Sequence, residues 1–317
     1  MKPSTSQTSL LFFYTESSLH VGSGSTVSTI DLPIQREQTT NYPMAQGSGI
    51  KGALRSQFAD DGDMKKVVFG DDKKGGSEYA SAASFSDARI ILFPVRSLNG
   101  VFAYTVCPFV LARLAREAGF AGVMSATDQK LFSSVAIKKN CALVTEKSDI
   151  KLTRGNELKV VLEEYSFTAE QNPSVAAIAK WIEAHALPAD PAYTYWRDKL
   201  QRSLIILSDD DFKDFVTNNT EVITRVAIDN SSKTVKPGAL WVQESLPADT
   251  LLFSSVTTRA TRSSELQKNA TEVSQWLSNQ VHQLGRVQIG GDETTGQGVV
   301  SLTWSQNSAE EGTNNGR

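Results

Sequence analysis

The 317-residue chain has few of the residues that build disulfide frameworks or metal centres. It contains two cysteines, Cys107 and Cys141, and three histidines that stand far apart, His20, His185 and His282. This scarcity argues against a disulfide-linked scaffold and a zinc-binding pattern, and we expect a reducing, cytoplasmic setting. The chain also has no apolar run near the ~20 residues that a membrane helix needs, so we expect no membrane partner.

A strong excess of positive charge is also absent. The chain has 32 Lys and Arg against 35 Asp and Glu, which gives a net charge of −3 at neutral pH. Bulk charge therefore argues against a free monomer that coats nucleic acid, whereas a locally basic groove would still bind RNA. The hydrophobic content of 40% suffices for a substantial core.

Apolar periodicity and turn residues predict a mixture of strands and helices. The predicted strands cover residues 10–19, 83–96, 101–107, 151–167, 204–207, 287–289 and 299–304. The predicted helices cover residues 49–58, 109–120, 174–186, 209–216 and 263–284, the last of them capped by Ser263 or Ser264. We therefore expect an α+β fold with a single elaborated domain over residues 1–304. The apolar-poor residues 305–317 predict a disordered tail.

Residues 20–55 hold the densest group of chemically informative residues. The turn Gly22-Ser23-Gly24 is followed by the segment IDLPIQRE, in which Asp31 stands before Leu and Pro. An aspartate in this position commonly hydrogen-bonds its own backbone in a turn. His20, at the end of a predicted strand, is either a structural residue, a general base or a ring that stacks on RNA.

A second glycine–serine turn, beginning at Gly47, opens the predicted helix over residues 49–58. Ser48 is the expected N-cap, and the uncapped amides with Lys51 predict an anion site, for which phosphate is the common ligand. Lys51 and Arg55 are four residues apart and share one helix face. The alternative for this pair is an ordinary solvated basic face.

Two further blocks stand near the end of the chain. The segment IGGDETTGQG over residues 289–298 has Gln297 where a phosphate-binding loop requires Lys, and it lies between two predicted strands. It is therefore either a tight β connection or a loop that contacts a ligand through its backbone. The segment TRVAIDNSSKTVKPGALWVQESLP over residues 224–247 predicts a hairpin that turns at Lys236, Pro237 and Gly238.

The three blocks together resemble the RAMP superfamily of CRISPR-associated proteins. The IDLPIQRE wording is similar to that of the repeated backbone subunit of the type III-B (Cmr) effector complex. The resemblance covers residues 20–298. It implies a modified ferredoxin-like (RRM-like) RAMP fold with insertions, in which a thumb β-hairpin occupies about residues 220–260.

The resemblance also implies a function. Such a subunit binds CRISPR guide RNA, forms a helical filament with copies of itself and other Cmr subunits, and cleaves complementary target RNA at regular intervals. Asp31 matches the catalytic loop aspartate and would share Mg²⁺ or another divalent cation with an RNA phosphate. Glu37 is either a helper in catalysis or, with the rest of the QRE triplet, part of a subunit-contact patch. The implied RNA-binding residues are His20, Gly22, Ser23, Gly24, Arg36, Ser48, Gly49, Lys51, Arg55, Gly290, Gly291, Gly296 and Gly298.

Two other functions remain open at this point. In the first, the protein is a non-catalytic guide-RNA scaffold, and Asp31 is structural. In the second, it is a stand-alone endoribonuclease that processes guide RNA, for which His20 is the available base.

Overall fold

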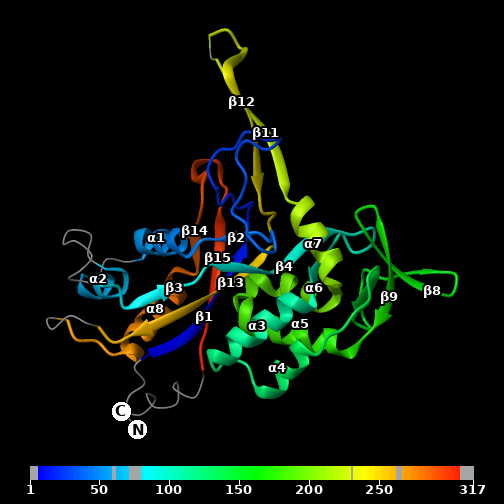
Figure 1. Cartoon of the computed structure of the whole chain (residues 1–317), viewed down its shortest axis with the longest axis horizontal. Coiled ribbons are helices and arrows are strands. Elements are labelled where there is room, and N and C mark those ends of the chain that lie inside the picture. Colours follow the sequence, from blue (N-terminus) through cyan, green and yellow to red (C-terminus); the bar gives the residue numbers. More distant parts are fainter. Residues whose placement is uncertain (1–5, 59–61, 71–79, 230, 262–265, 308–317) are drawn as a thin grey trace.

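The computed structural model describes residues 6–58, 62–70, 80–229, 231–261 and 266–307. Within these ranges the chain forms a large mixed β-sheet with helices packed on it, and a two-stranded hairpin that projects from one end (Figure 1). The predicted α+β class is confirmed. No helix in the described ranges combines the length and the apolar character needed to cross a membrane.

In the first and last thirds of the chain, most strands lie close to the residues predicted for them. In chain order they are β1 (Ser6–Thr15), β2 (Met44–Ala45), β3 (Ala83–Phe85), β4 (Ala88–Arg96), β5 (Phe102–Val106), β6 (Cys141–Val144), β7 (Leu152–Arg154), β8 (Glu157–Leu162), β9 (Tyr165–Gln171), β10 (Leu204–Leu207), β11 (Glu221–Ile228), β12 (Val235–Ser245), β13 (Leu251–Arg259), β14 (Arg286–Gln288) and β15 (Val299–Ser305).

The α-helices begin at side-chain caps or prolines in several cases, as expected from the unsatisfied amides of a helix start. They are α1 (Gly47–Gln57), α2 (Asp63–Phe69), α3 (Pro108–Phe120), α4 (Ala126–Ser133), α5 (Pro173–Ala186), α6 (Thr194–Ser203), α7 (Asp209–Asn218) and α8 (Ala270–Leu284). Short 3₁₀ turns cover Pro191–Tyr193 and Glu293–Thr295.

Strand β1 lies at the centre of one half of the sheet. It pairs antiparallel with β13 on one side and β15 on the other, so that Phe12 lies opposite both Phe253 and Thr303. Residues 10–14 are almost completely buried, because helices cover the strand in addition to its two neighbours. The full order is β14-β15-β1-β13-β4-β5-β10-β6-β9-β8-β7, with β2 on β4 and β3 on β13.

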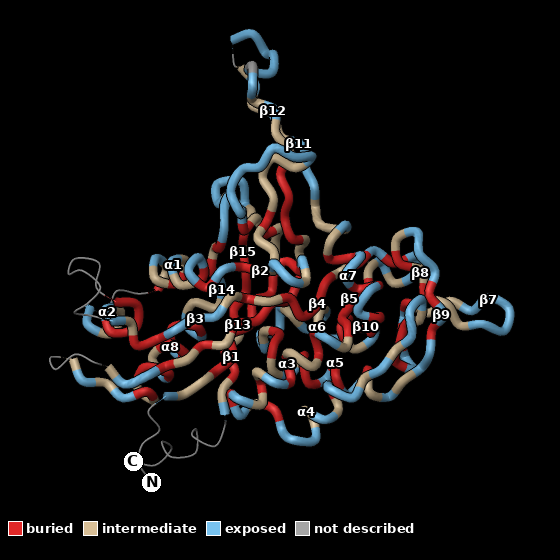
Figure 2. The backbone as a smooth tube through the Cα atoms, viewed as in Figure 1, coloured by how far each residue is buried: buried red, intermediate tan, exposed pale blue. Residues whose placement is uncertain are grey.

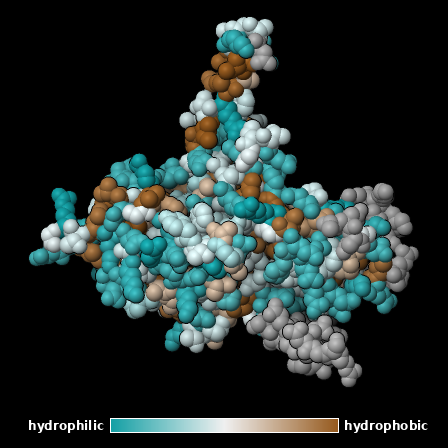
Figure 3. All heavy atoms as spheres, turned by 180° about the vertical axis from the view of Figure 1, so that it is seen from behind, coloured by the Kyte–Doolittle hydropathy of each residue, from teal (hydrophilic) through white to brown (hydrophobic). Residues whose placement is uncertain are grey.

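The projecting hairpin consists of β11 and β12, which pair antiparallel with Thr224 opposite Val242. At the turn between β11 and β12, the Asp229 carboxylate accepts hydrogen bonds from the amides of Ser231 and Ser232. Beyond its base the described residues of the hairpin are exposed or intermediate, and none of them is buried (Figure 2). Its exposed apolar side chains form a hydrophobic stretch (Figure 3); they are Val222, Ile223, Val226, Ile228, Val235 and Leu240.

Three predicted boundaries in the hairpin and helix regions differ from the structure. The turn predicted at Lys236, Pro237 and Gly238 lies inside β12. The thumb segment predicted to reach about residue 260 ends at Ser245, because β13 pairs with β1 and β4 in the centre of the main sheet. Helix α8 begins at Ala270 rather than residue 263, since Asn269 and Glu272 form a reciprocal capping box.

The predicted caps Ser263 and Ser264 lie outside the described residues. Most of the tail predicted for residues 305–317 also lies outside them. At its start, Ser305 is the last residue of β15, and Gln306 Oε1 accepts a hydrogen bond from Trp304 Nε1 at 3.0 Å.

Candidate functional site

Asp31 lies on a short segment, residues 30–37, that pairs with the base of the projecting hairpin and is called the Asp31 segment below. The Asp31 N–H donates to Val242 O at 3.0 Å, and the Val242 N–H donates back to Asp31 Oδ2 at 2.7 Å. The pairing continues along the strand, because the Leu32 N–H also donates to Val242 O and the Glu244 N–H donates to Leu32 O, each at 3.0 Å. The segment therefore covers the second edge of β12, opposite β11.

The Asp31 carboxylate is partly exposed and keeps one oxygen available. Oδ2 is occupied by the Val242 amide, whereas no partner contacts Oδ1 among the described residues. This differs from the self-contained turn that an aspartate before Leu-Pro favours. Oδ1 can accept a proton or coordinate an ion without disturbing the contact that fixes the side chain.

Glu244 is a buried acid at the same junction, with 3% of its surface exposed. Its Oε1 accepts hydrogen bonds from Arg36 at 2.5 Å and from the Thr220 hydroxyl at 2.7 Å, and its Oε2 accepts from the Ile34 N–H at 3.0 Å. Arg36 also donates to the Asn41 and Val216 carbonyls, at 2.9 and 3.0 Å. Arg36 therefore helps to hold this segment in place, and its role in RNA binding stays a prediction.

His20 lies between this junction and the glycine-rich loop. Its Nδ1 is 2.6 Å from the carbonyl oxygen of Glu244, and its own carbonyl accepts the Gly291 N–H at 2.9 Å. The ring is so close to Gly22 that a Cβ added there would come within 2.8 Å of Nε2. His20 is therefore held in place by its backbone neighbours, which favours the structural role among its alternatives.

The glycines of the second block fall into two groups. A Cβ added at Gly290 would lie 2.2 Å from the His20 carbonyl oxygen, and one added at Gly298 would lie 2.1 Å from that of Ile289. Both positions also have positive φ, so glycine is required by close backbone packing. Gly296 has open space around it, and Gly291 is exposed. The N–H groups of both are nevertheless already bonded within the chain, Gly291 to the His20 carbonyl and Gly296 to the Glu293 carbonyl, each at 2.9 Å.

Asp292, inside this loop, joins it to the hairpin. Its carboxylate is 3.1 Å from the Arg225 guanidinium on β11 and accepts a hydrogen bond from the Gln243 side chain on β12. The glycine-rich loop and the Asp31 segment thus hold the hairpin base through neighbouring residues of β12.

The first glycine–serine turn is placed beside the Asp31 segment. The Ser23 N–H donates to the Pro33 carbonyl at 3.0 Å, and Gly22 pairs with Ile34. Gln35 connects this turn to the start of α1, because its side chain bonds both the Gly22 carbonyl and the Gln46 amide. Gly22, Ser23 and Gly24 are all exposed, as a ligand-contacting turn requires.

Helix α1 begins at Gly47, not at residue 49, and Ser48 does not cap it. The Gly47 N–H is bound instead by Asp87 Oδ1 at 2.9 Å, so an internal carboxylate already occupies part of the expected anion site. The exposed residues Ser48 and Gly49 follow this contact. Burial, and secondarily the nearby Arg55, lower the pKa of the half-buried Lys51. Arg55 donates to the Gly70 carbonyl at 3.2 Å.

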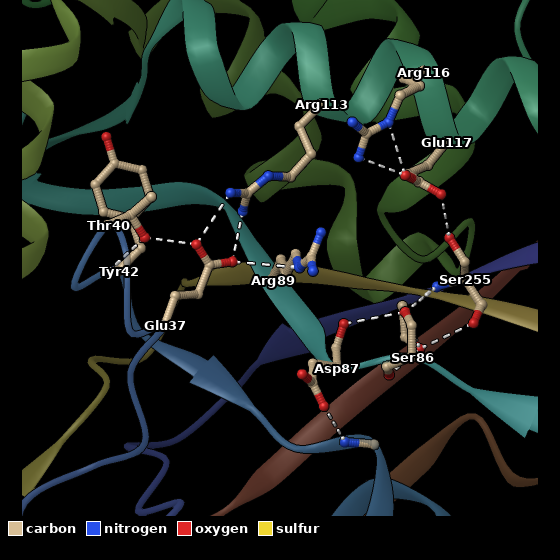
Figure 4. A network of polar contacts seen from close by, with 12 residues as sticks. Glu37, Thr40, Tyr42, Ser86, Asp87, Arg89, Arg113, Arg116, Glu117 and Ser255 are labelled. Carbon is tan, nitrogen blue, oxygen red and sulfur yellow. Dashed lines mark hydrogen bonds and ion pairs between the residues drawn. The ribbon is translucent and has the colours of Figure 1, made fainter.

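Glu37 is fully engaged in an internal network (Figure 4). Its carboxylate is 2.6 Å from Arg113 on α3, 3.3 Å from Arg89 on β4, and accepts a hydrogen bond from the Thr40 hydroxyl at 2.6 Å. The side chain is 10% exposed. Glu37 therefore anchors the end of the Asp31 segment to the core, and both of its carboxylate oxygens already have partners within the chain.

The described residues do not form a ready-made metal site. No group of three His, Cys, Asp or Glu side chains lies close enough in the described ranges to hold an ion. A single carboxylate oxygen, Asp31 Oδ1, fits an ion only when other ligands come from a bound molecule, such as phosphate oxygens of RNA.

Sequence reasoning missed Glu244, Asp292 and Asp87, which support the predicted residues from distant parts of the chain. Glu244 is 208 positions from its partner Arg36, and Asp87 is 40 positions from Gly47. The one available signal was an acid within the otherwise uncharged segment WVQES, because a charged side chain in a half-buried strand usually has a partner.

Comparisons with known proteins agree with the resemblance seen in the sequence. A profile of the RAMP superfamily matches residues 12–301. The chain is 33% identical to the CRISPR system Cmr endoribonuclease Cmr4 of Pyrococcus furiosus, over 97% of both chains. It is 27% identical to the CRISPR system CMR subunit Cmr4 of Saccharolobus solfataricus, over 90% of this chain and 92% of that protein.

Solved structures show the same fold. The crystal structure of oligomeric Cmr4 from Pyrococcus furiosus matches with a TM-score of 0.67 and 28% identity, covering 95% of this chain and 98% of that one. A chain of the type III-B Cmr-beta complex bound to cognate target RNA, studied by cryo-electron microscopy, matches with a TM-score of 0.72 and 23% identity, over 94% and 96% of the two chains.

Proposed function

The chain belongs to the RAMP superfamily, and we propose that it is the backbone subunit of a type III-B CRISPR ribonucleoprotein that cleaves complementary target RNA. Several copies would bind one guide RNA as a helical filament together with other Cmr subunits. A head-to-tail contact that does not close on itself generates such a filament. Relatives named Cmr endoribonuclease and oligomeric Cmr4 support the assignment.

The observation that supports cleavage most directly is the position of Asp31 at the foot of the hairpin. The hairpin exposes apolar side chains that have no core of their own, as expected of an element that inserts into a nucleic-acid duplex. A nucleotide displaced by the hairpin would leave the stack next to Val242, to which Asp31 is bonded. The RNA backbone would therefore be distorted where a carboxylate oxygen is available.

The proposed reaction is attack of a ribose 2′-OH on the adjacent phosphate. The new bond joins the 2′-oxygen to phosphorus, the bond from phosphorus to the 5′-oxygen breaks, and the proton lost by the 2′-OH is balanced by one gained at the 5′-oxygen. Asp31 Oδ1 would contribute in one of two ways, by steering the 2′-OH proton or by holding a divalent cation. Holding the backbone in line for attack would supply a large share of the rate enhancement.

Metal dependence is part of the proposal. Asp31 would be the single ligand from this chain, and phosphate oxygens of the RNA would complete the coordination of Mg²⁺ or another divalent cation. When bound there, the ion would stabilise negative charge that develops on the phosphate.

Guide RNA would be bound by backbone amides and by the positively charged side chain of Lys51. The contributing groups would be the exposed turn of Gly22, Ser23 and Gly24, the amides of Ser48 and Gly49, and Lys51. Gln35 joins the turn to the start of α1, because its side chain bonds the Gly22 carbonyl and the Gln46 amide. Such contacts recognise the shape and charge of a nucleic-acid backbone rather than its bases. Sequence specificity would come from guide–target base pairing, as in other RNA-guided effectors.

A non-catalytic scaffold is the second candidate, because one observation favours it. The hydrogen bond from the Val242 N–H to Asp31 Oδ2 is the kind of contact that a purely structural aspartate makes at a strand edge. In that case Asp31 would hold the hairpin, and the assembly would bind target RNA without cutting it.

The two candidates are separated by incubating a guide-loaded assembly with end-labelled complementary RNA and Mg²⁺, with target binding measured in parallel. The ribonuclease predicts regularly spaced products that disappear in Asp31→Ala while target binding persists. Binding without any cleavage by the wild-type assembly would establish the scaffold. Undiminished cleavage by Asp31→Ala would show that another residue is catalytic.

A further inference from the structure

We propose that Glu244 is a positioning residue for cleavage, which sets the place of Asp31 without touching RNA itself. The inference rests on the proposed function of Asp31. It assigns a role to the buried acid of β12 that goes beyond holding the hairpin together.

The contacts of Glu244 converge on the segment that contains Asp31. Its side chain accepts the Ile34 N–H and the Arg36 guanidinium, and its backbone N–H donates to the Leu32 carbonyl. Leu32, Ile34 and Arg36 alternate along the segment, so Glu244 fixes it at every second residue. Its carbonyl oxygen also contacts Nδ1 of His20, which lies in the chain between the end of β1 and the segment.

The other side of the Asp31 segment offers few anchors. Residues 22–29 are all exposed, and most of their hydrogen bonds are made among themselves or to residues 30–33. The orientation of Asp31 therefore depends on the Val242 contact and on the restraints that follow it in the chain, of which Glu244 supplies the buried ones.

The ionised form of Glu244 suits this role. A carboxylate accepts several hydrogen bonds at once and binds a guanidinium strongly, whereas a neutral amide of the same shape loses the charge-assisted contact with Arg36. Weakening this contact would let the segment shift relative to β12. A displacement of about 1 Å at a reacting group can reduce a rate by roughly 100-fold.

The alternative is that Glu244 anchors the hairpin in a general way. Asp292 provides a matched control, because it also holds the hairpin base, through Arg225 and Gln243, but contacts nothing in the Asp31 segment. Asp292→Asn keeps the size of the side chain and suits its positive φ. Glu244→Gln likewise keeps the size of its side chain.

The experiment compares guide-loaded assemblies of wild type, Glu244→Gln, Asp292→Asn, Asp31→Asn and the double variant Glu244→Gln with Asp31→Asn. The single-turnover cleavage rate at saturating assembly, the Kd for target RNA and the Tm of the subunit are measured for each. We expect Glu244→Gln to slow cleavage about 10-fold or more with Kd changed less than about twofold, and Asp292→Asn to keep the rate within about twofold. Adding Glu244→Gln to Asp31→Asn should cause no further loss of rate, because Glu244 acts through Asp31.

Two results would overturn the inference. One is wild-type cleavage by Glu244→Gln when Asp31→Asn is inactive, which leaves the proposed function intact. The other is an equal loss of rate in Glu244→Gln and Asp292→Asn, which would show general anchoring. Full activity of Asp31→Asn would instead refute the proposed function. Should Glu244→Gln fail to fold, Thr220→Val removes one hydrogen bond to Oε1 while keeping the ion pair, and it should slow cleavage about threefold.

Discussion

Val242 donates its backbone N–H to Asp31 Oδ2 at 2.7 Å, although the two residues are 211 positions apart. The return contact, from the Asp31 N–H to the Val242 carbonyl at 3.0 Å, closes a small ring of hydrogen bonds at the foot of the hairpin. The residue proposed to cleave RNA is therefore hydrogen-bonded directly to the hairpin that is proposed to distort it. We expect a substitution in one to change the position of the other.

This relationship predicts how the Val242 amide responds to substitution. Asp31→Ala removes the acceptor, so hydrogen exchange of the Val242 amide should accelerate about 10-fold or more, since local opening exposes it to water. Asp31→Asn retains an oxygen acceptor and should exchange nearly as slowly as wild type. Exchange monitored by NMR checks both, with the amide of Phe253 in β13 as the unaffected reference. Unchanged protection of Val242 in Asp31→Ala would contradict the contact.

The two groups of glycines predict different costs for the same substitution. Gly298→Ala places a methyl group 2.1 Å from the Ile289 carbonyl oxygen at a positive φ, whereas Gly296→Ala meets nothing within 4 Å. We expect Gly296→Ala to cost about 1 kcal/mol, from its backbone conformation alone. Gly298→Ala should cost clearly more, by roughly 2 kcal/mol or above, because the backbone must move. Urea unfolding of both variants measures the difference, and equal values would show that the close approach is not rigid.

Lys51 is predicted to bind guide-RNA phosphate. Lys51→Met should weaken guide RNA binding about equally for all sequences and reduce the slope of log K against log salt concentration by about 0.7, the value for one phosphate contact on a single strand. Lys180→Met, at an exposed lysine of α5, is the control and should leave the slope unchanged. A slope that stays at the wild-type value in Lys51→Met would remove Lys51 from the RNA interface.

Replacing Asp249 by asparagine is expected to stabilise the fold to an extent that depends on pH. Burial raises the pKa of its carboxyl, and its backbone has a positive φ, which asparagine also adopts readily. Below the unfolded pKa of about 3.9 the group is neutral in both states and costs nothing. As the pH rises through that value, the unfolded chain ionises first, so folding becomes less favourable.

Asp249→Asn should therefore have a higher Tm than wild type at pH 7, and the gap should close as the pH falls below about 4. Thermal unfolding between pH 3.5 and 7.5 measures it. Tyr14 donates its hydroxyl to Asp249 Oδ1, a contact that the amide oxygen of asparagine can keep. A gap that widens toward low pH would mean that the carboxylate stabilises the fold.

Local sequence signals predicted much of the fold because they depend on neighbouring residues. The helix opened by the second glycine–serine turn and the strands around the glycine-rich loop lie close to where periodicity and turn residues placed them. The strand predicted over residues 10–19 is also present, but as β1 it covers Ser6–Thr15 and ends before Leu19. Errors came where a local signal competed with another. The Pro237-Gly238 pair has the residue types of a turn, but the chain turns earlier, where the Asp229 carboxylate accepts the amides of Ser231 and Ser232. Strand β12 therefore runs through the predicted turn.

The supporting residues of the site were beyond local prediction. Arg36 looks like a free cation in the sequence, yet a buried acid more than 200 positions away neutralises it. Ser48 is of a residue type that commonly caps helices, but the Gly47 N–H at the start of α1 donates to the Asp87 carboxylate instead. Such pairings are set by how the sheet and the loops pack together, and no spacing in the sequence records them.

The most direct test of the account is the single-turnover cleavage rate of a guide-loaded assembly carrying Asp31→Asn. This variant keeps the shape of the side chain and an acceptor for the Val242 amide, so the hairpin and target binding should be preserved. We predict a loss of about 100-fold or more in rate, since general acid–base groups typically contribute that much. A wild-type rate in Asp31→Asn would contradict a catalytic role for the carboxylate and leave Asp31 as a structural anchor of the hairpin.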